Sequence, residues 1–218
     1  MINFHIITVF PELVTGYLTE SIIARAIASG KIGVEVYNLR DFTTCKHGRV
    51  DDRPYGPGPG MLLMAEPVLL ATEAITAKLP TEARVKILIT APAGSQLTNK
   101  LAGSWVKDYT DIIIIAGRYE GLDARVKDIL GAEEISIGAY ILTGGELPAL
   151  VMLDVAARHI PGVLGNELSL EENRVASSDS YTRPEVLIYK GKEYGVPKVL
   201  LSGHHKNIDE WRQGRNAN

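Results

Sequence analysis

Four consecutive isoleucines, Ile112 to Ile115, place apolar side chains on both faces of any strand that they form. Such a strand is buried on both sides, which is typical of a parallel sheet covered by helices. Further β-branched stretches predict strands over residues 2–9, 33–39 and 85–90. Apolar residues at helical spacing predict helices over residues 11–28, 66–78, 98–108, 122–130 and 146–160. The chain is therefore predicted to be an α/β protein with a mostly parallel sheet flanked by helices.

The regular alternation stops after the last of these helices, where Pro161 and Gly162 follow. We expect a large domain, an interdomain linker and a short C-terminal region, over residues 1–160, 161–180 and 181–218 respectively. The C-terminal region is expected to be a small helical appendage that closes with a helix from about Lys206 to Arg212. Residues 40–60 are polar and rich in Gly and Pro, so they are predicted to form a loop.

Composition excludes several classes of protein. The N-terminal segment lacks the features of a signal peptide, and no apolar run approaches the ~20 residues of a membrane span. Cys45 is the single cysteine, and no His, Asp or Glu spacing resembles a metal site. The net charge of −3 disfavours a protein that coats nucleic acid. We expect a cytoplasmic protein with no membrane association and no bound metal.

Three glycine-rich segments are predicted to leave the carboxyl ends of strands, where α/β sheets bind their ligands. They are Thr90 to Gly94, Ala116 to Gly121 and Ser136 to Pro148. Each alone is most simply an ordinary turn, but three together favour a ligand site that backbone groups approach closely. No dinucleotide-binding or ATP-binding glycine motif is present, which disfavours a dehydrogenase or a phosphoryl-transfer enzyme.

Motifs spread over the whole chain resemble those of the bacterial tRNA (guanine-N1)-methyltransferases, the TrmD family of the SPOUT superfamily. The stretches that carry this resemblance are FPE (10–12), RDFT (40–43), VDDRPYGPGPGM (50–61), GRYEGLDARV (117–126), SIGAYILTGGELPAL (136–150), IPGVLGNE (160–167), YTRPEV (181–186) and VLLSGHH (199–205). These stretches occur in the same order as in the family and cover essentially the whole chain, so together they are more specific than any single motif. A related SPOUT enzyme with another RNA target is disfavoured by the GVLGNE and YTRP stretches.

The resemblance implies a deep trefoil knot in the α/β domain and a pocket for S-adenosylmethionine formed by the loops of the knot. It also implies a homodimer with shared active sites, and a tRNA substrate with guanosine at position 37 that is methylated at N1. A requirement for Mg²⁺ does not follow from any residue pattern in the sequence. By position, the cofactor pocket of the family corresponds to Pro92, Gly117, Tyr119, Glu120, Gly121, Ser136, Ile137, Gly138, Ala139, Tyr140, Ile141, Leu142, Gly144, Gly145 and Pro148.

Methylation of guanine N1 requires removal of its proton and stabilisation of the negative charge that develops on O6. The resemblance assigns the cationic helper to Arg158, although an ion pair with Asp154 one helical turn earlier is the alternative interpretation. The catalytic aspartate of the family falls on Asn173, and a neutral amide cannot act as a carboxylate base. Ala139 also stands where the family usually has aspartate. A cofactor-binding, RNA-binding protein with weakened or lost catalysis is therefore the alternative function.

Other candidates for the proton acceptor are Glu171, Glu172 and Asp179. Basic residues gather in the predicted 40–60 loop and in the C-terminal region, where they are expected to contact phosphates of tRNA. They are Arg40, Lys46, His47, Arg49, Arg53, Arg174, Arg183, His204, His205, Lys206 and Arg212. Tyr55 and Tyr181 are the aromatic residues expected to stack on a base. The family continues beyond the position of Trp211 and Arg212, so the tRNA-binding region is expected to be short or truncated.

Overall fold

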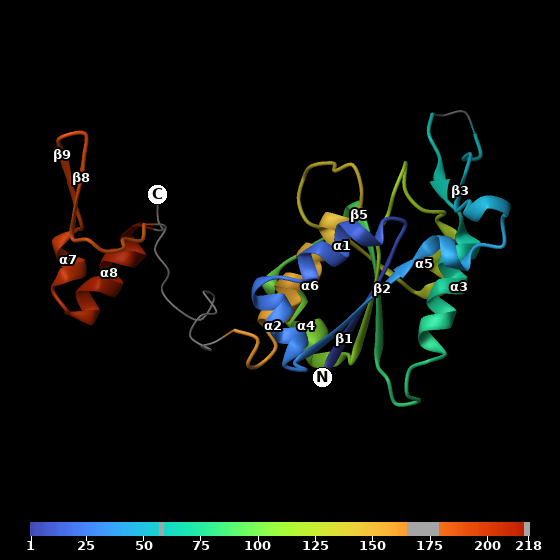
Figure 1. Cartoon of the computed structure of the whole chain (residues 1–218), viewed down its shortest axis with the longest axis horizontal. Helices are drawn as coiled ribbons and strands as arrows, with labels where there is room; N and C mark the ends of the chain where they lie inside the picture. Colours follow the sequence, from blue (N-terminus) through green and yellow to red (C-terminus); the bar gives the residue numbers. More distant parts are fainter. Residues whose placement is uncertain (57–58, 165–178, 216–218) are drawn as a thin grey trace. The chain divides into compact units, whose positions relative to one another are not determined.

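The computed structural model describes residues 1–56, 59–164 and 179–215 of the chain. Two compact units, Met1–Gly165 and Asn166–Asn218, make up the protein (Figure 1). The division between them falls inside the segment that the sequence predicts as a linker.

A five-stranded sheet lies at the centre of the first unit, with the strand order β2-β1-β6-β5-β7. Every pair of neighbouring strands in it is parallel, which confirms the fold class predicted from the sequence. The strands are β1 (Ile2–Thr8), β2 (Ile32–Asn38), β5 (Val85–Gln96), β6 (Asp111–Ile115) and β7 (Glu133–Ser136).

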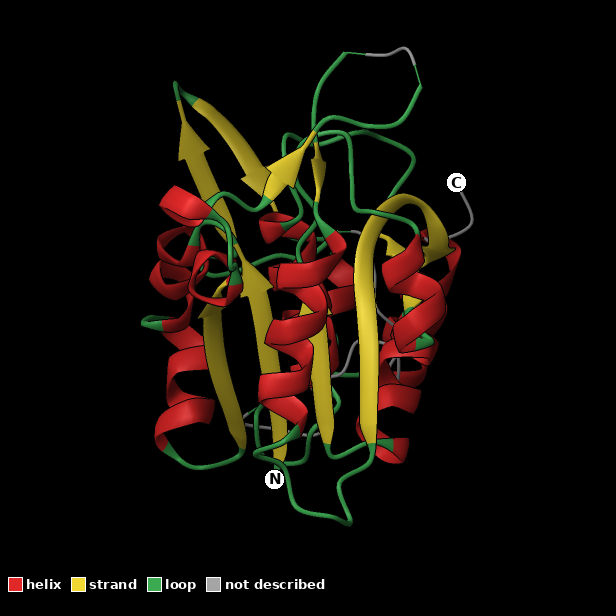
Figure 2. Cartoon of the chain, turned by 90° about the vertical axis from the view of Figure 1, so that its right-hand side faces the viewer, coloured by secondary structure: helices red, strands yellow, loops and turns green. Residues whose placement is uncertain are grey.

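Helices cover both faces of this sheet (Figures 1 and 2). One face carries α1 (Pro11–Leu18), α2 (Ser21–Ala28), α4 (Asn99–Asp108) and α6 (Glu146–Arg158), and the other carries α3 (Ala65–Thr76) and α5 (Arg125–Leu130). Each face therefore has its own apolar core. On the central strand, Ile112 and Ile114 belong to the first core, and Ile113 and Ile115 belong to the second. The isoleucine run is buried on both sides, as its composition requires.

Two predicted helices differ from those in the structure. The continuous helix expected over residues 11–28 is wrong, because the chain turns between α1 and α2. There the Thr19 hydroxyl donates to the carbonyl of Gly16, and Ser21 has a φ of 61°. The helix expected from residue 122 begins only at Arg125, because Leu122 forms a bridge with Leu63 instead.

The segment Thr90 to Gly94, predicted to be a loop after a strand, lies inside the long strand β5. Both Thr90 and Ser95 pair with Ile135 of β7, so the four residues between them form a bulge within the ladder. Gly94 packs so closely that a Cβ atom on it would lie 2.4 Å from the carbonyl carbon of Glu134. A glycine is thus required where the bulge rejoins the sheet.

The predicted 40–60 loop contains short regular elements. Two 3-10 turns, η1 (Leu39–Phe42) and η2 (Lys46–Gly48), precede β3 (Asp51–Asp52), which pairs antiparallel with β4 (Leu62–Leu63). Val50 and Leu63 are buried in the second core and anchor the ends of this segment.

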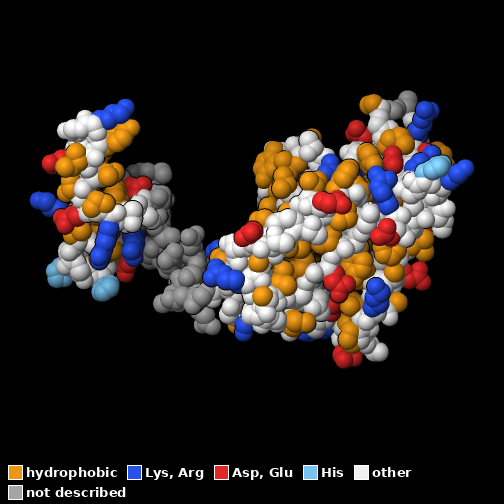
Figure 3. All heavy atoms as spheres, in the orientation of Figure 1, with side chains coloured by type: hydrophobic (Ala, Val, Ile, Leu, Met, Phe, Trp, Pro, Cys, Tyr) orange, Lys and Arg blue, Asp and Glu red, His pale blue; other side chains and the backbone are white. Residues whose placement is uncertain are grey.

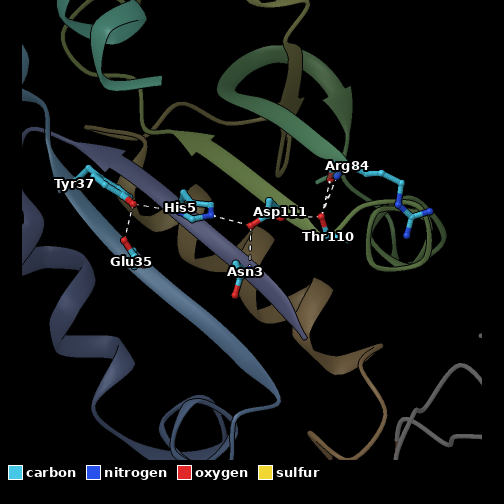
Figure 4. Close-up of polar contacts among 7 residues, drawn as sticks. All are labelled: Asn3, His5, Glu35, Tyr37, Arg84, Thr110 and Asp111. Carbon is cyan, nitrogen blue, oxygen red and sulfur yellow. Dashed lines mark hydrogen bonds and ion pairs between the residues drawn. The ribbon is translucent and has the colours of Figure 1, made fainter. Parts of the chain in front are cut away.

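A chain of polar side chains, centred on buried His5 and Asp111, crosses the sheet near its amino-terminal edge (Figure 4). The carboxylate of Asp111 accepts hydrogen bonds from the Asn3 amide at 3.0 Å and the Thr110 hydroxyl at 2.7 Å, and His5 Nε2 lies 3.2 Å from it. On the other side of His5, the Tyr37 hydroxyl donates to Glu35 at 2.6 Å. Burial, followed by this hydrogen bond, raises the pKa of Tyr37.

The second unit contains the expected closing helix, but also a hairpin that the expectation of a small helical appendage did not include. Its elements are β8 (Val186–Tyr189), β9 (Lys192–Gly195), α7 (Lys198–Leu201) and α8 (His205–Arg215). Lys190 and Gly191 both adopt positive φ between the two strands, as a two-residue hairpin turn requires. Among residues 179–212 none is buried.

Candidate active site

A cavity of about 250 Å³ lies where the segments that follow β6 and β7 meet the bulge of β5. This is the carboxyl end of the sheet, where ligands of parallel α/β proteins bind. Its size is just below the range of roughly 300–1,000 Å³ that is usual for ligand pockets. The lining residues are Thr90, Ala91, Pro92, Gly117 to Gly121, Ile135 to Gly138, Tyr140 to Gly145 and Pro148.

Fourteen of the fifteen residues predicted to bind the cofactor line this one cavity. Ala139 is the exception: it is exposed and does not line the cavity. The structure adds Thr90, Ala91, Arg118, Ile135 and Thr143. Each of these five residues lies within two positions of a predicted one in the sequence, and Arg118 lies inside the GRYEG motif itself.

Backbone contacts hold the walls of the cavity together. The amide of Gly145 donates to the carbonyl of Gly117 at 2.7 Å, and the amide of Gly117 donates to the Thr90 hydroxyl at 2.9 Å. A Cβ atom on Gly145 would lie 2.1 Å from Thr90 Oγ1 and 2.5 Å from the amide nitrogen of Gly117. The three segments thus meet at a point that admits only glycine.

The charge in this lining is limited. Arg118 is the only Lys or Arg among the lining residues, and its guanidinium is paired with the buried carboxylate of Glu146 at 2.9 Å. Glu120 is the only acidic residue of the lining. Most of the uncharged lining consists of glycine backbone and of the apolar side chains of Pro92, Ile137 and Leu142. The cavity therefore suits a ligand that carries an apolar ring and positive charge rather than a group of phosphates.

Arg158 lies at the opposite end of α6 from the cavity. Pro148 lines the cavity, and the ten-residue separation from Pro148 to Arg158 corresponds to about 15 Å along a helix. The alternative ion pair with Asp154 is not formed, because Asp154 accepts a 2.6 Å hydrogen bond from the Tyr17 hydroxyl instead. That hydrogen bond raises the pKa of Tyr17 to about 12. Within the described part of the chain, Arg158 has no ion-pair or hydrogen-bond partner.

Several residues singled out in the sequence lie outside the described residues. They are Asn173, Glu171, Glu172 and Arg174. Asp179 is described and is half-buried in the second unit.

The basic residues of the 40–55 segment form an exposed surface on the first unit (Figure 3). Its basic residues are Arg40, Lys46, His47, Arg49 and Arg53, and Tyr55 beside them is fully exposed. Arg49 pairs with Asp52 at 3.0 Å, while Arg40 donates to the carbonyl of Gly48. In the second unit, Arg183, His204, His205 and Lys206 are exposed as well.

The described residues contain neither a metal-binding cluster nor a membrane-spanning helix. No group of three or more His, Cys, Asp or Glu side chains there is arranged to hold a metal ion. Nor does any helix in that part of the chain have the length and hydrophobicity needed to cross a bilayer.

Comparison with known proteins gives one consistent result. A family model described as tRNA (Guanine-1)-methyltransferase TrmD matches residues 2–218. A tRNA (guanine-N(1)-)-methyltransferase of Thermomicrobium roseum is 44% identical over 214 residues, which cover 97% of this chain and 77% of the relative. Proteins of the same description from Pseudoalteromonas atlantica and Clostridioides difficile are 43% and 44% identical, and the matches cover 78% and 90% of their lengths. The same two matches cover 96% and 97% of this chain, respectively.

Proposed function

Because the chain belongs to the tRNA (guanine-1)-methyltransferase family, we propose that it methylates N1 of guanosine 37 in tRNA with S-adenosylmethionine as methyl donor. The observation that carries this proposal is the clustering of fourteen predicted cofactor residues around one cavity. These residues come from three segments that are distant in the sequence, so their convergence is not a consequence of chain proximity.

The chemistry of the cavity fits S-adenosylmethionine. Its adenosine is uncharged and has no phosphate, which agrees with a lining whose single guanidinium is already neutralised by Glu146. Backbone groups of the glycine-rich segments are available to the edge of the adenine. The exposed carboxylate of Glu120 offers attraction to the positive charges of the sulfonium and the amino group.

When bound, S-adenosylmethionine supplies an electrophilic methyl group on a sulfonium. Methylation forms a bond from that carbon to guanine N1 and leaves the former sulfonium as a neutral thioether, while the N1 proton passes to a base. The protein therefore has to align N1 with the methyl group, accept the proton and stabilise charge on O6. We assign the last task to Arg158.

This assignment requires two copies of the chain. Arg158 lies about 15 Å along α6 from the cavity of its own chain, too far to contact a base that receives the methyl group there. We propose that the partner in a homodimer supplies it. Leu147, Val151 and Arg158 share one face of α6, and exposed Leu13 and Tyr17 on α1 extend the apolar surface beside it. An apolar surface of this kind is typical of a homodimer interface.

The resemblance places Asn173 at the position of the family aspartate, and its neutral amide cannot accept the proton as a carboxylate would. Glu171, Glu172 and Asp179 are the alternatives within the linker. We propose further that the second unit and the exposed 40–55 surface contact tRNA phosphates. Residues 179–218 carry seven Lys and Arg against five Asp and Glu, whereas residues 1–164 carry 15 against 18. The trefoil knot, expected for the cavity segments, and a cytoplasmic location are part of the same proposal.

Transfer of labelled methyl groups to two tRNA transcripts, one with guanosine and one with adenosine at position 37, tests the function. Label on the guanosine transcript alone is expected. An absence of label on both, with cofactor binding intact, would favour the alternative of a cofactor-binding, RNA-binding protein. Asn173 and Ala139 motivate that alternative. Asn173→Asp would then be expected to create activity, because a positioned base contributes about 10²–10⁴-fold. Repeating the assay with EDTA decides whether Mg²⁺ is required.

A further inference from the structure

Arg118 is held on three sides at the wall of the cavity. Its Nε lies 3.0 Å and 2.9 Å from the two carboxylate oxygens of Glu146, and its Nη1 donates to the carbonyl of Thr143 at 3.1 Å. The ring of Phe10 stacks on the guanidinium with 4.5 Å between the guanidinium carbon and the ring centroid. The side chain is therefore restrained by contacts with Glu146, Thr143 and Phe10.

Glu146 ties this arrangement to the core. It is the first residue of α6, is 3% exposed, and does not itself line the cavity. Its carboxylate also accepts a 2.8 Å hydrogen bond from the hydroxyl of Thr8, at the end of β1. The ends of β1 and β6 and the start of α6 are thus joined through one carboxylate. Phe10 of the FPE stretch and Thr8 just before it thus contact the two members of the ion pair.

Gly144 packs closely against both members of this pair. A Cβ atom on Gly144 would lie 2.4 Å from Arg118 Nε and 2.7 Å from Glu146 Oε2. Next to it, the Gly145 amide binds the Gly117 carbonyl. The ion pair is therefore packed tightly against the 136–145 segment, beside the backbone hydrogen bond that joins this segment to Gly117.

We propose that Glu146 is a positioning residue for the methyl donor, which acts through Arg118 to fix the separation of these two cavity walls. This inference rests on the proposed function of the cavity. A buried ion pair is seldom retained for stability, because desolvation of both charges offsets their attraction. Removal of both partners together is therefore expected to leave the fold intact and to show the positioning role alone.

The test compares R118M, E146L and the double variant R118M/E146L by thermal unfolding and by calorimetry with S-adenosylmethionine. Each single variant buries an unpaired charge, so its melting temperature is expected to fall. The double variant is expected to recover most of the wild-type melting temperature. Its affinity for S-adenosylmethionine is nevertheless expected to remain at least about tenfold weaker, the scale of one lost charged hydrogen bond.

Steady-state kinetics gives a readout that a structural role alone would not move. The KM for S-adenosylmethionine is expected to rise in the double variant while the KM for tRNA is unchanged. The matched control is K86M/E133L, because Lys86 and Glu133 form a 2.7 Å ion pair between β5 and β7 whose residues do not line the cavity. Its affinity for S-adenosylmethionine is expected to equal that of the wild type.

Wild-type affinity in a folded R118M/E146L would overturn the positioning role. If that variant does not fold, E146Q decides, because it removes the negative charge opposite Arg118 at almost unchanged volume and puts an NH2 group at one of the two carboxylate oxygen positions. Unchanged affinity in E146Q would then contradict the inference, and a loss would support it. Absence of binding by the wild-type protein is a separate outcome, because it contradicts the proposed function.

Discussion

The imidazole Nε2 of His5 lies 3.2 Å from Oδ1 of Asp111, and both side chains are buried between neighbouring strands β1 and β6 (Figure 4). A buried carboxylate is costly unless its oxygens are hydrogen-bonded. Burial alone would raise the pKa of Asp111, but hydrogen bonds from Thr110, Asn3 and His5 outweigh it and lower the pKa below its ordinary value of 3.8. The network therefore links the stability of the sheet to pH.

The first prediction concerns this network. Because the folded protein lowers the pKa of Asp111, its ionised form contributes stability above about pH 4, and that contribution is lost as the pH falls through the lowered value. Asp111→Asn is expected to reduce the free energy of unfolding at pH 7 by about 1–3 kcal/mol. It should also flatten the loss of stability below pH 4. Urea unfolding at pH 3, 4, 5 and 7 measures both effects.

Asp123→Asn is the control, since the pKa of Asp123 is also lowered, first by its hydrogen bond from Arg125. That pair is on the surface, with the Arg125 side chain 72% exposed, so its contribution is expected to be small. An equal loss of stability in Asp111→Asn and Asp123→Asn would show that burial of Asp111 does not increase its contribution to stability.

The sequence predicts the layers of this fold well, because burial on both faces leaves a direct signal in the side chains. The alternation of Ile112 to Ile115 between two cores follows from the pleat of a strand alone. The β5 bulge was not predicted, because its Ala-Pro-Ala-Gly sequence has the composition of a turn, and only pairing with Ile135 shows that the strand resumes. The β8–β9 hairpin was missed because Lys190, rather than Asn or Asp, occupies its turn.

The candidate site, like the fold, was predicted from the sequence only in part. The glycine-rich segments and the family motifs indicate which residues surround the cavity, because they are contiguous in the sequence. The pairing of Arg118 with Glu146 across 28 positions and the hydrogen bond from Thr8 have no local signature. Likewise, the helical spacing of Asp154 and Arg158 predicts an ion pair, but Tyr17 from a different helix takes the carboxylate. Tertiary contacts override local spacing at these points.

The second prediction tests the homodimer. Val151→Arg places a charge in the middle of the exposed apolar face of α6, where Val151 is 38% exposed. Burying this charge in an interface without a partner is unfavourable, so the variant is expected to be monomeric in light scattering. Methyl transfer should fall at least about 100-fold, the scale of one missing electrostatic donor, because Arg158 of a second copy is lost.

Ile129→Arg is its control. Ile129 is 63% exposed on α5, which covers the other face of the sheet, so the variant is expected to keep the wild-type mass and activity. A monomeric Val151→Arg protein with full activity would show that each site is complete within one chain.

The third prediction separates binding from chemistry at Arg158. Arg158→Ala is expected to lower kcat by about 10²–10³-fold, the usual effect of removing a group that stabilises developing negative charge. The affinity for S-adenosylmethionine should be unchanged, because Arg158 does not line the cavity. Arg25→Ala on α2 removes an exposed arginine that does not line the cavity either and serves as the control. Wild-type turnover by Arg158→Ala would refute its role.

The last prediction uses the contact between two cavity segments. In Gly145→Ala the new Cβ atom would meet the Gly117 amide at 2.5 Å and the carbonyl carbon of Ala116 at 2.9 Å, both of which are backbone atoms that cannot rotate away. The segments must move apart, and the Gly145–Gly117 hydrogen bond is lost with them. Calorimetry is expected to show that S-adenosylmethionine binds at least about tenfold more weakly. A loss of about 1.4 kcal/mol in binding free energy is enough for this effect.

Gly16→Ala makes the same chemical change where nothing lies within 4 Å of the added atom, in the middle of α1. Alanine in a helix is more stable than glycine by roughly 0.5–1 kcal/mol, so this variant should melt slightly higher and bind S-adenosylmethionine normally. The contrast distinguishes steric exclusion at the cavity from a general effect of glycine replacement. Equal binding by the two variants would mean that the contact between Gly145 and Gly117 does not shape the cofactor site.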